Sequence, residues 1–138
     1  MKYKITEGSN QSEPAYQTSG SAAFDLCATE SVHLDDHLHM MNLGIAFQIP
    51  FGFYGKLVVR SSMAKRGIML GHGTGIIDSD YRGEVFAPIY SRHTGGSKIE
   101  KGERIVQMII CPVERVQLER VDDLEETARG SGGFGSTN

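Results

Sequence analysis

The sequence predicts an all-β fold of the jelly-roll or β-sandwich type, with at most one short helix. No stretch sustains the three-and-four spacing of apolar residues that marks a helix, whereas several short runs alternate or are β-branched throughout. Glycine or proline bounds these runs, and many short strands separated by turn residues favour a sandwich over alternating β and α units. Glycine accounts for 17 of 138 residues, above the usual share of about 7%, which suggests that main-chain groups carry part of the recognition.

The expected elements follow in chain order. The short runs predict strands over residues 2–5, 24–28, 33–38, 41–48, 55–59, 84–90, 104–112 and 114–119. The helical candidate is a turn or two over residues 62–65. The stretch 9–20 is polar and contains one proline, so we expect a loop there.

A chain of 138 residues has the size of one domain with one core, and we assign residues 1–128 to it. Residues 129–138 contain four glycines, one arginine and one phenylalanine. Such a segment cannot bury enough apolar area to order itself. We therefore expect a flexible C-terminal arm that becomes ordered when a ligand binds.

The charge balance argues against two classes of partner. A net charge of -3 and a pI near 5.9 give no basic face for nucleic acid or for an anionic membrane. No apolar run approaches the roughly 20 residues that span a bilayer. We expect no nucleic-acid polymer and no membrane among the partners.

The start of the chain and its cysteines predict a location inside the cell. The opening MKYKITEGSN has no apolar stretch that resembles a signal peptide. Cys27 and Cys111 each stand beside apolar residues, which favours buried thiols in a reducing compartment over a disulfide. The expected location is the cytoplasm, or the interior of the host cell if the source is a virus.

Arg60, Ser61 and Ser62 follow a predicted strand and open the predicted helical turn. Exposed backbone N–H groups at such a turn, with serine hydroxyls and a guanidinium, can bind phosphate oxygens. An ordinary serine-rich N-cap is the alternative, and these residues taken alone favour it.

The glycine-rich stretch 71–83 predicts a hairpin around a ligand, because glycines at both ends permit tight and left-handed backbone conformations. Its main chain could read the edge of a base. Asp78, which follows two apolar residues, could act as general base for a water. Aspartate is also common in ordinary turns, which is the competing interpretation.

Two further stretches offer groups to a ligand. Gln107 interrupts an apolar strand, and a buried amide needs a hydrogen-bond partner, either a ligand or neighbouring backbone. In the arm, Phe134 could stack on a base while Arg129 offers a fixed charge to a polyphosphate. An unstructured tail is the alternative, since glycine- and serine-rich termini usually form one.

A histidine cluster could be pictured as a metal site. It comprises His33, His37 and His39 with Asp35 and Asp36. The three histidines share a face of a strand by parity alone, so a solvated strand and turn is favoured.

The order and spacing of these stretches resemble the trimeric deoxyuridine triphosphatase family over nearly the whole chain. Five motifs of that family occur in order, at residues 21–28 (SAAFDLCA), 60–62 (RSS), 75–83 (GIIDSDYRG), 102–107 (GERIVQ) and 129–137 (RGSGGFGST). The third and fifth are highly specific strings. The departures are small: Ala23 stands where the family usually has glycine, and Asn138 replaces the usual final glycine.

The resemblance implies a jelly-roll subunit and a homotrimer with shared active sites, in which the arm of one chain closes the site of another. It also implies a dUTP diphosphatase, which hydrolyses dUTP to dUMP and pyrophosphate. This reaction limits uracil in DNA and supplies dUMP for dTMP synthesis.

The resemblance further implies a role for each matched residue. Asp78 would activate the water that attacks the α-phosphorus, and Tyr81 would pack under the deoxyribose and exclude a 2'-hydroxyl. The substrate-binding set would be Arg60, Ser61, Ser62, His72, Gly73, Gly75, Ile76, Ile77, Tyr81, Gln107, Arg129, Phe134, Gly135, Ser136 and Thr137. His72 occupies a variable position, where its ring either contacts uracil or points away.

Within that set, each stretch has its own part of the substrate. The backbone of residues 73–78 would read uracil and exclude the methyl group of thymine. Arg60, Ser61 and Ser62 would hold phosphates, and Gln107 would contact phosphate or the catalytic water. On closure Phe134 would cover uracil, while Arg129, Ser136 and Thr137 engage the β and γ phosphates.

The implied cofactor is Mg²⁺, held mainly by the triphosphate and water. Mg²⁺ commonly keeps several waters and binds substrate phosphates, which agrees with a sequence that offers no obvious cluster of protein ligands. Asp25 would support the metal's water shell or the fold.

Two other functions compete with this one. The dCTP deaminases share the fold and an Arg-Ser-Ser string. Their catalytic Glu lies five residues beyond the glycine that corresponds to Gly83, and this chain has Pro88 there. They also carry Arg at the position of Lys65. The second alternative is a binding module that has lost catalysis. Intact Asp78, Tyr81 and Arg129 argue against it.

Overall fold

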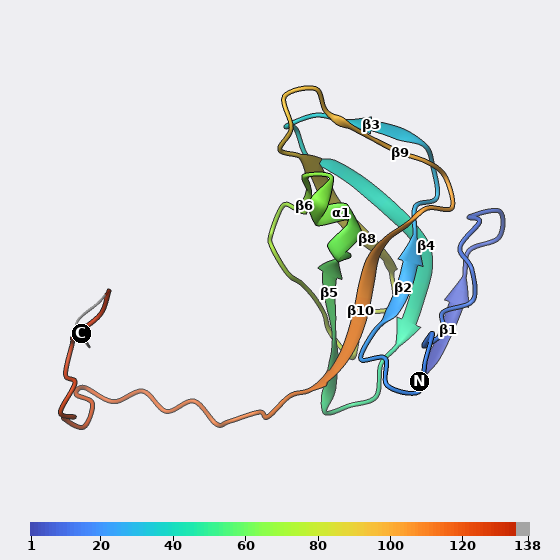
Figure 1. The fold of residues 1–138 in the computed structure, drawn as a ribbon. Helices are drawn as coiled ribbons and strands as arrows, with labels where there is room; N and C mark the ends of the chain where they lie inside the picture. The colour runs from blue at the N-terminus through green and yellow to red at the C-terminus, as the bar shows by residue number, and fades with distance from the viewer. Residues whose placement is uncertain (135–138) are drawn as a thin grey trace.

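The structure, a computed structural model, describes residues 1–134, and its regular elements are nearly all strands (Figure 1). In chain order they are β1 (Lys2–Ile5), β2 (Phe24–Cys27), β3 (Val32–Leu34), β4 (His39–Gln48), β5 (Phe53–Val59), α1 (Ser61–Lys65), β6 (Ile68–Leu70), β7 (Gly75–Ile77), β8 (Glu84–Ser91), β9 (Ser97–Ile99) and β10 (Arg104–Pro112). The predicted β fold with one short helix is confirmed. Within the described residues no helix has the length and apolar character needed to cross a membrane.

Two antiparallel four-stranded sheets form the body of the subunit. Their strand orders are β1-β4-β8-β6 and β2-β10-β5-β7, while β3 and β9 form a separate two-stranded sheet. Consecutive strands among the described residues always lie in different sheets, because the connections cross from one sheet to another as in a jelly roll.

Alternation of side chains builds the core between the sheets. In β8, Val85, Ala87 and Ile89 are fully buried while the residues between them face outward, as the period of two in a strand requires. β4 and β10 contribute Leu43 and Met108 in the same way, and the buried residues of both sheets join in a single cluster. Burial of each such Val, Leu, Ile or Met side chain stabilises the fold by roughly 1.5–3 kcal/mol, and of Ala87 by less.

Three strands escaped the sequence analysis: β6, β7 and β9, each three residues long. A run of three residues is too short to display a period of two, and each of these strands borders glycine or serine that favours a loop assignment. Their existence depends on partners in the sheet, which the local sequence does not reveal.

Two expected strands are wrong in part or in whole. The strand expected over residues 33–38 ends at Leu34, because Asp35 accepts a hydrogen bond from the His37 N–H at 2.9 Å and turns the chain. The strand expected over residues 114–119 is absent. Figure 1 shows the chain leaving the sheets after β10, and Leu118 is 91% exposed. The alternating pattern there therefore has no partner strand within the part of the chain that the structure describes.

Candidate active site

The phosphate-binding candidates lie where β5 ends. Arg60 is the N-cap of α1, with extended backbone angles and no side-chain cap, so the alternative of a serine-capped helix is wrong. Ser61 and Ser62 are the first two helical residues and both are exposed. Arg60, Ser61 and Ser62 thus stand together where β5 passes into α1.

Asp25 of β2 holds this arginine in place. Its side chain is 13% exposed, with Oδ1 at 2.9 Å from Arg60 Nε and Oδ2 at 3.1 Å from Arg104 Nη1. Arg60 Nη1 also donates to the carbonyl oxygen of Arg104 at 3.2 Å. Charge-assisted bonds of this kind fix the plane of a guanidinium. The sequence analysis gave no role to Arg104, because nothing local indicates a shared carboxylate.

Gln107 lies beside this cluster. On β10 it is opposite Asp25 of β2 and Val58 of β5, which places it between the two strands that carry the other groups. Of the two partners expected for its amide, neighbouring backbone is not the one found, because the side chain is only half-buried and forms no hydrogen bond within the described part of the chain. Its amide is free to meet a ligand or water.

The base-reading candidates lie on β7, an outer strand of its sheet. Gly75, Ile76 and Ile77 pair with β5 on one side, so the N–H and C=O groups along the other edge have no strand partner among the described residues. The expected hairpin over residues 71–83 is corrected: β6 and β7 flank its turn but belong to different sheets. Gly73 takes a left-handed φ of 69° in that turn.

The ring of His72 lies against β7. A Cβ added at Gly75 would come within 3.1 Å of His72 Cε1 and of Leu57 Cβ. The imidazole therefore packs on the glycine of the edge strand, and its contact with uracil stays a prediction.

Asp78 follows β7 directly and is exposed. It borders two cavities, one of about 240 Å³ shared with Ile76 and Tyr81, the other of about 180 Å³ shared with Ile76 and Tyr54. A carboxylate at the rim of such cavities can accept a proton from a water bound next to a ligand.

Tyr81 has a defined ring position in the first of these cavities. Its hydroxyl donates to the carbonyl oxygen of Glu84 at 2.9 Å. A Cβ at Gly83 would come within 2.3 Å of the Tyr81 hydroxyl oxygen, so the ring lies across the backbone of this glycine. Any larger residue at position 83 would displace the ring.

The two halves of the site lie at opposite ends of β5. Ile77 pairs with Gly55, and Arg60 lies five residues further along the chain. At about 3.3 Å per residue this separates the Asp78 side from the Arg60 side by roughly 17 Å. The structure thus brings Asp25, Arg60 and Gln107 together but leaves Asp78 apart from them within one chain.

The described part of the arm, residues 129–134, does not reach either half in this chain. Arg129 donates from Nε to the carbonyl oxygen of Gly132 at 2.9 Å, and Phe134 is fully exposed. Figure 1 shows this segment far from the sheets. The predicted binding residues Gly135, Ser136 and Thr137 lie outside the described residues.

The histidines do not converge on one metal site. His37 contacts Asp36 at 3.1 Å and Asp35 at 3.4 Å, while His39 contacts Glu30 at 3.0 Å. The carboxylates and imidazole at 35–37 are close enough to share an ion but are all exposed, which agrees with the solvated strand and turn favoured by the sequence.

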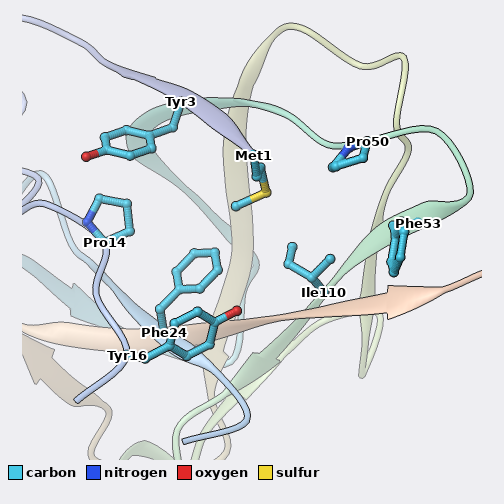
Figure 2. A pocket seen from close by; sticks show the side chains of 8 residues that line it. All are labelled: Met1, Tyr3, Pro14, Tyr16, Phe24, Pro50, Phe53 and Ile110. Carbon is cyan, nitrogen blue, oxygen red and sulfur yellow. The ribbon is translucent and has the colours of Figure 1, made fainter. Parts of the chain in front are cut away.

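An apolar cavity of about 440 Å³ lies elsewhere on the subunit (Figure 2). Its lining comprises Met1, Tyr3, Pro14, Tyr16, Phe24, Pro50, Phe53 and Ile110. It contains none of the predicted site residues and no carboxylate or guanidinium, so it lacks the chemistry to bind a polyphosphate.

The hydrogen bonds of Glu84 make the stability of the fold depend on pH. Its carboxylate accepts hydrogen bonds from the Thr6 hydroxyl and the Asn42 amide, which lower the pKa of Glu84 below its usual 4.5. A carboxyl whose pKa is lower in the folded state stabilises the fold above the unfolded pKa and loses this effect as the pH falls through the folded pKa. Glu84→Gln should therefore lower Tm at pH 7, with the difference from wild type shrinking below pH 4.5. Melting curves from pH 7 to pH 3 measure this, and a constant difference would contradict it.

Comparison with known proteins identifies relatives that match nearly the whole chain, including the candidate site residues. The sequence profile of the dUTPase family matches residues 9–138. The deoxyuridine 5'-triphosphate nucleotidohydrolase of Nautilia profundicola is 40% identical over 140 residues, covering 99% of each chain. The protein of the same name from Hahella chejuensis is 44% identical over 129 residues, covering 90% of this chain and 85% of its own. Among solved structures, the dUTPase of Staphylococcus bacteriophage 80alpha with dUPNHPP superposes with a TM-score of 0.87 at 26% identity, covering 99% of this chain and 97% of that one.

Proposed function

The chain belongs to the dUTPase family, and on that premise we propose that it hydrolyses dUTP to dUMP and pyrophosphate with Asp78 as the general base. The observation that carries the proposal is the placement of an exposed carboxylate at the end of an edge strand, beside a cavity bounded by Tyr81. The outer edge of β7, which has no strand partner within residues 1–134, supplies donors and acceptors for a base, and the acid stands next to it.

In the proposed reaction Asp78 accepts a proton from a bound water. The water oxygen forms a bond to the α-phosphorus, and the bond from that phosphorus to the oxygen bridging to the β-phosphorus breaks. Pyrophosphate leaves with the bonding electrons. Positioning of this kind, with charge stabilisation, accounts for most of the catalysis in phosphoryl transfer.

The phosphate side is assigned to Arg60, Ser61, Ser62 and Gln107. Their support is the orientation of the Arg60 guanidinium by Asp25, which leaves further N–H donors of Arg60 for phosphate oxygens. Mg²⁺ fits this donor set as a partner of phosphate and water, since both oxygens of Asp25 already meet arginines and leave it an outer-shell role. When bound, the ion neutralises phosphate charge.

We infer that the complete site is shared between chains of a homotrimer. A separation of roughly 17 Å between the two halves is too large for one α-phosphorus to meet Asp78 and the Arg60 cluster of the same chain. Two neighbouring subunits can each supply one half. The division into a domain of residues 1–128 and an arm of residues 129–138 belongs to the same proposal, with the arm closing the site of a neighbour.

The segment between β10 and the arm provides a test of assembly. Its apolar side chains are exposed, namely Val116 at 72%, Leu118 at 91%, Val121 at 51% and Leu124 at 87%. We expect them to be covered by a neighbouring subunit, so Leu118→Ser with Leu124→Ser should remove about 3 kcal/mol or more of burial and shift the trimer toward monomer at micromolar concentration. Light scattering after size exclusion measures the mass, with Glu119→Ser as the matched polar control. An unchanged trimer would place these side chains outside the interface.

Tyr81→Ala tests the exclusion of ribonucleotides. Removing the ring opens space under the sugar, so the preference for dUTP over UTP in kcat/KM should fall by up to about 10²-fold, the range in which a pocket rejects an added hydroxyl. Unchanged preference in the variant would show that another group guards the sugar.

The proposed function itself is tested by pyrophosphate release from dUTP, dTTP, dCTP and UTP with magnesium. We expect release from dUTP alone. Ammonia released from dCTP would instead indicate the deaminase alternative, which Pro88 on β8 disfavours. No turnover with dUTP would indicate a binding module.

A further inference from the structure

A β-bulge in β4 faces the start of β8. Asn42 pairs with Phe86 and Ala46 pairs with Glu84, so the register shifts between the two pairs. Within the bulge Gly44 has a φ of 61°, and its N–H donates to Asn42 Oδ1 at 2.7 Å. Bulges interrupt the ladder locally and often lie next to active sites, where they redirect a side chain.

The carboxylate of Glu84 joins three strands at this interruption. One oxygen accepts from the Thr6 hydroxyl at the end of β1, and the other from the amide of Asn42 in β4. The backbone of Thr6 is tied to the same bulge, since its N–H donates to the Gly44 carbonyl oxygen at 2.8 Å. The side chain of Glu84 thus replaces ladder hydrogen bonds that the bulge removes.

The backbone of the same residue holds the ring of Tyr81. Its carbonyl oxygen accepts the Tyr81 hydroxyl at 2.9 Å, and the ring lies across Gly83, where no Cβ would fit. Glu84, Tyr81 and Asp78 line one cavity. A shift in the backbone of Glu84 would therefore move the Tyr81 ring, because a hydrogen bond joins the two.

We propose that Glu84 is a positioning residue for sugar discrimination, because its carboxylate fixes the carbonyl group that holds the Tyr81 ring. The inference rests on the proposed function, in which this ring lies under the deoxyribose. It extends that function to residues outside the five sequence motifs, namely Thr6, Asn42 and Glu84.

The test compares kcat/KM for dUTP and for UTP in wild type, Glu84→Gln, Glu84→Ala and Tyr81→Phe. Loss of one net hydrogen bond corresponds to about a threefold to tenfold change, so Glu84→Ala should lower the dUTP preference by about that factor. Glu84→Gln retains one acceptor oxygen, so its preference for dUTP should lie between those of Glu84→Ala and wild type. Glu100→Ala is the matched control, because Glu100 accepts a side-chain hydroxyl from Ser31, as Glu84 does from Thr6, but lies away from the Tyr81 cavity. The dUTP preference of this control should equal that of wild type.

A double-mutant cycle separates positioning from general loosening of the fold. Tyr81→Phe lacks the hydroxyl, so adding Glu84→Ala to it should cause no further loss of preference. An equal loss with and without the hydroxyl, or no loss in Glu84→Ala, would overturn the proposal.

Ring position can also be read without turnover. In a chain with labelled tyrosines, the NMR signal of the Tyr81 ring, assigned with Tyr81→Phe, should shift in Glu84→Ala but not in Glu100→Ala. If the wild-type protein does not hydrolyse dUTP, the proposed function is refuted, but the NMR shift still tests whether Glu84 positions the Tyr81 ring. If the Tyr81 signal does not shift in Glu84→Ala, the positioning role of Glu84 is refuted, even if the protein hydrolyses dUTP.

Discussion

Deletion of residues 129–138 is expected to lower kcat/KM for dUTP by roughly 10³-fold or more while the proposed trimer remains assembled. The arm carries Arg129, and an arginine supplied to a reacting phosphate contributes about 10³ to 10⁵ in rate. It also carries Phe134, and stacking of an aromatic ring on a base is worth about 1–3 kcal/mol. Pyrophosphate release measures the loss, and size exclusion with light scattering monitors the assembly.

The deletion can be dissected with two point variants. Arg129→Lys keeps the charge but loses the planar fork of donors, so it should lower kcat more than it raises KM. Phe134→Ala should mainly raise KM, because stacking contributes to binding of the base before the chemistry. A truncated protein with wild-type turnover would show that the arm has no part in closing the site.

Much of the body could be predicted because its strands are long enough to show their period. β1 and β10 have the predicted bounds, and β4 and β8 differ from prediction by one or two residues at an end. Every second residue of β8 from Val85 to Ser91 is buried, and this alternation is visible in the sequence. Local information suffices where a strand of eight or nine residues packs one face on the core.

Other features depend on contacts between distant parts of the chain. The carboxylate of Asp25 meets Arg60 and Arg104, which lie 35 and 79 residues away in sequence, and no local pattern links them. β7 has three residues and is a strand only because β5 lies beside it. The strand predicted over residues 114–119 is the opposite case: its residues alternate, but residues 1–134 offer no partner strand for it.

The sequence therefore identified the candidate residues more readily than it predicted their positions relative to one another. Arg60, Asp78 and Gln107 were selected by the order and spacing of five motifs that resemble a known family, since each stretch taken alone left a structural alternative open. Their division between two ends of β5 follows only from the register of β7 on β5. That register makes sharing between chains a requirement of the proposed chemistry.

Asp78→Asn should lower kcat for dUTP by at least about 10²-fold with little change in binding or in Tm. Asparagine has nearly the same shape as aspartate but no carboxylate to accept the proton of the attacking water, and general-base contributions begin near this size. Single-turnover pyrophosphate release gives the rate, and calorimetric titration with a non-hydrolysable dUTP analogue gives the affinity. Asp36→Asn is the matched control, since Asp36 is exposed and far from β7 in sequence. Turnover equal to that of wild type would remove Asp78 from the mechanism.

Combining the two inactive proteins tests the shared site directly. If the arm of one chain closes the site of another, a mixed trimer can pair an intact Asp78 from the truncated chain with an intact arm from the Asp78→Asn chain. Co-refolding the two proteins at equal amounts should then restore activity well above the sum of the separate preparations. If each arm instead closed the Asp78 site of its own chain, every site in the mixture would lack either the base or the arm, and activity would stay at that sum. The outcome thus distinguishes exchange between subunits from closure within one, without relying on the position of the arm in an isolated chain.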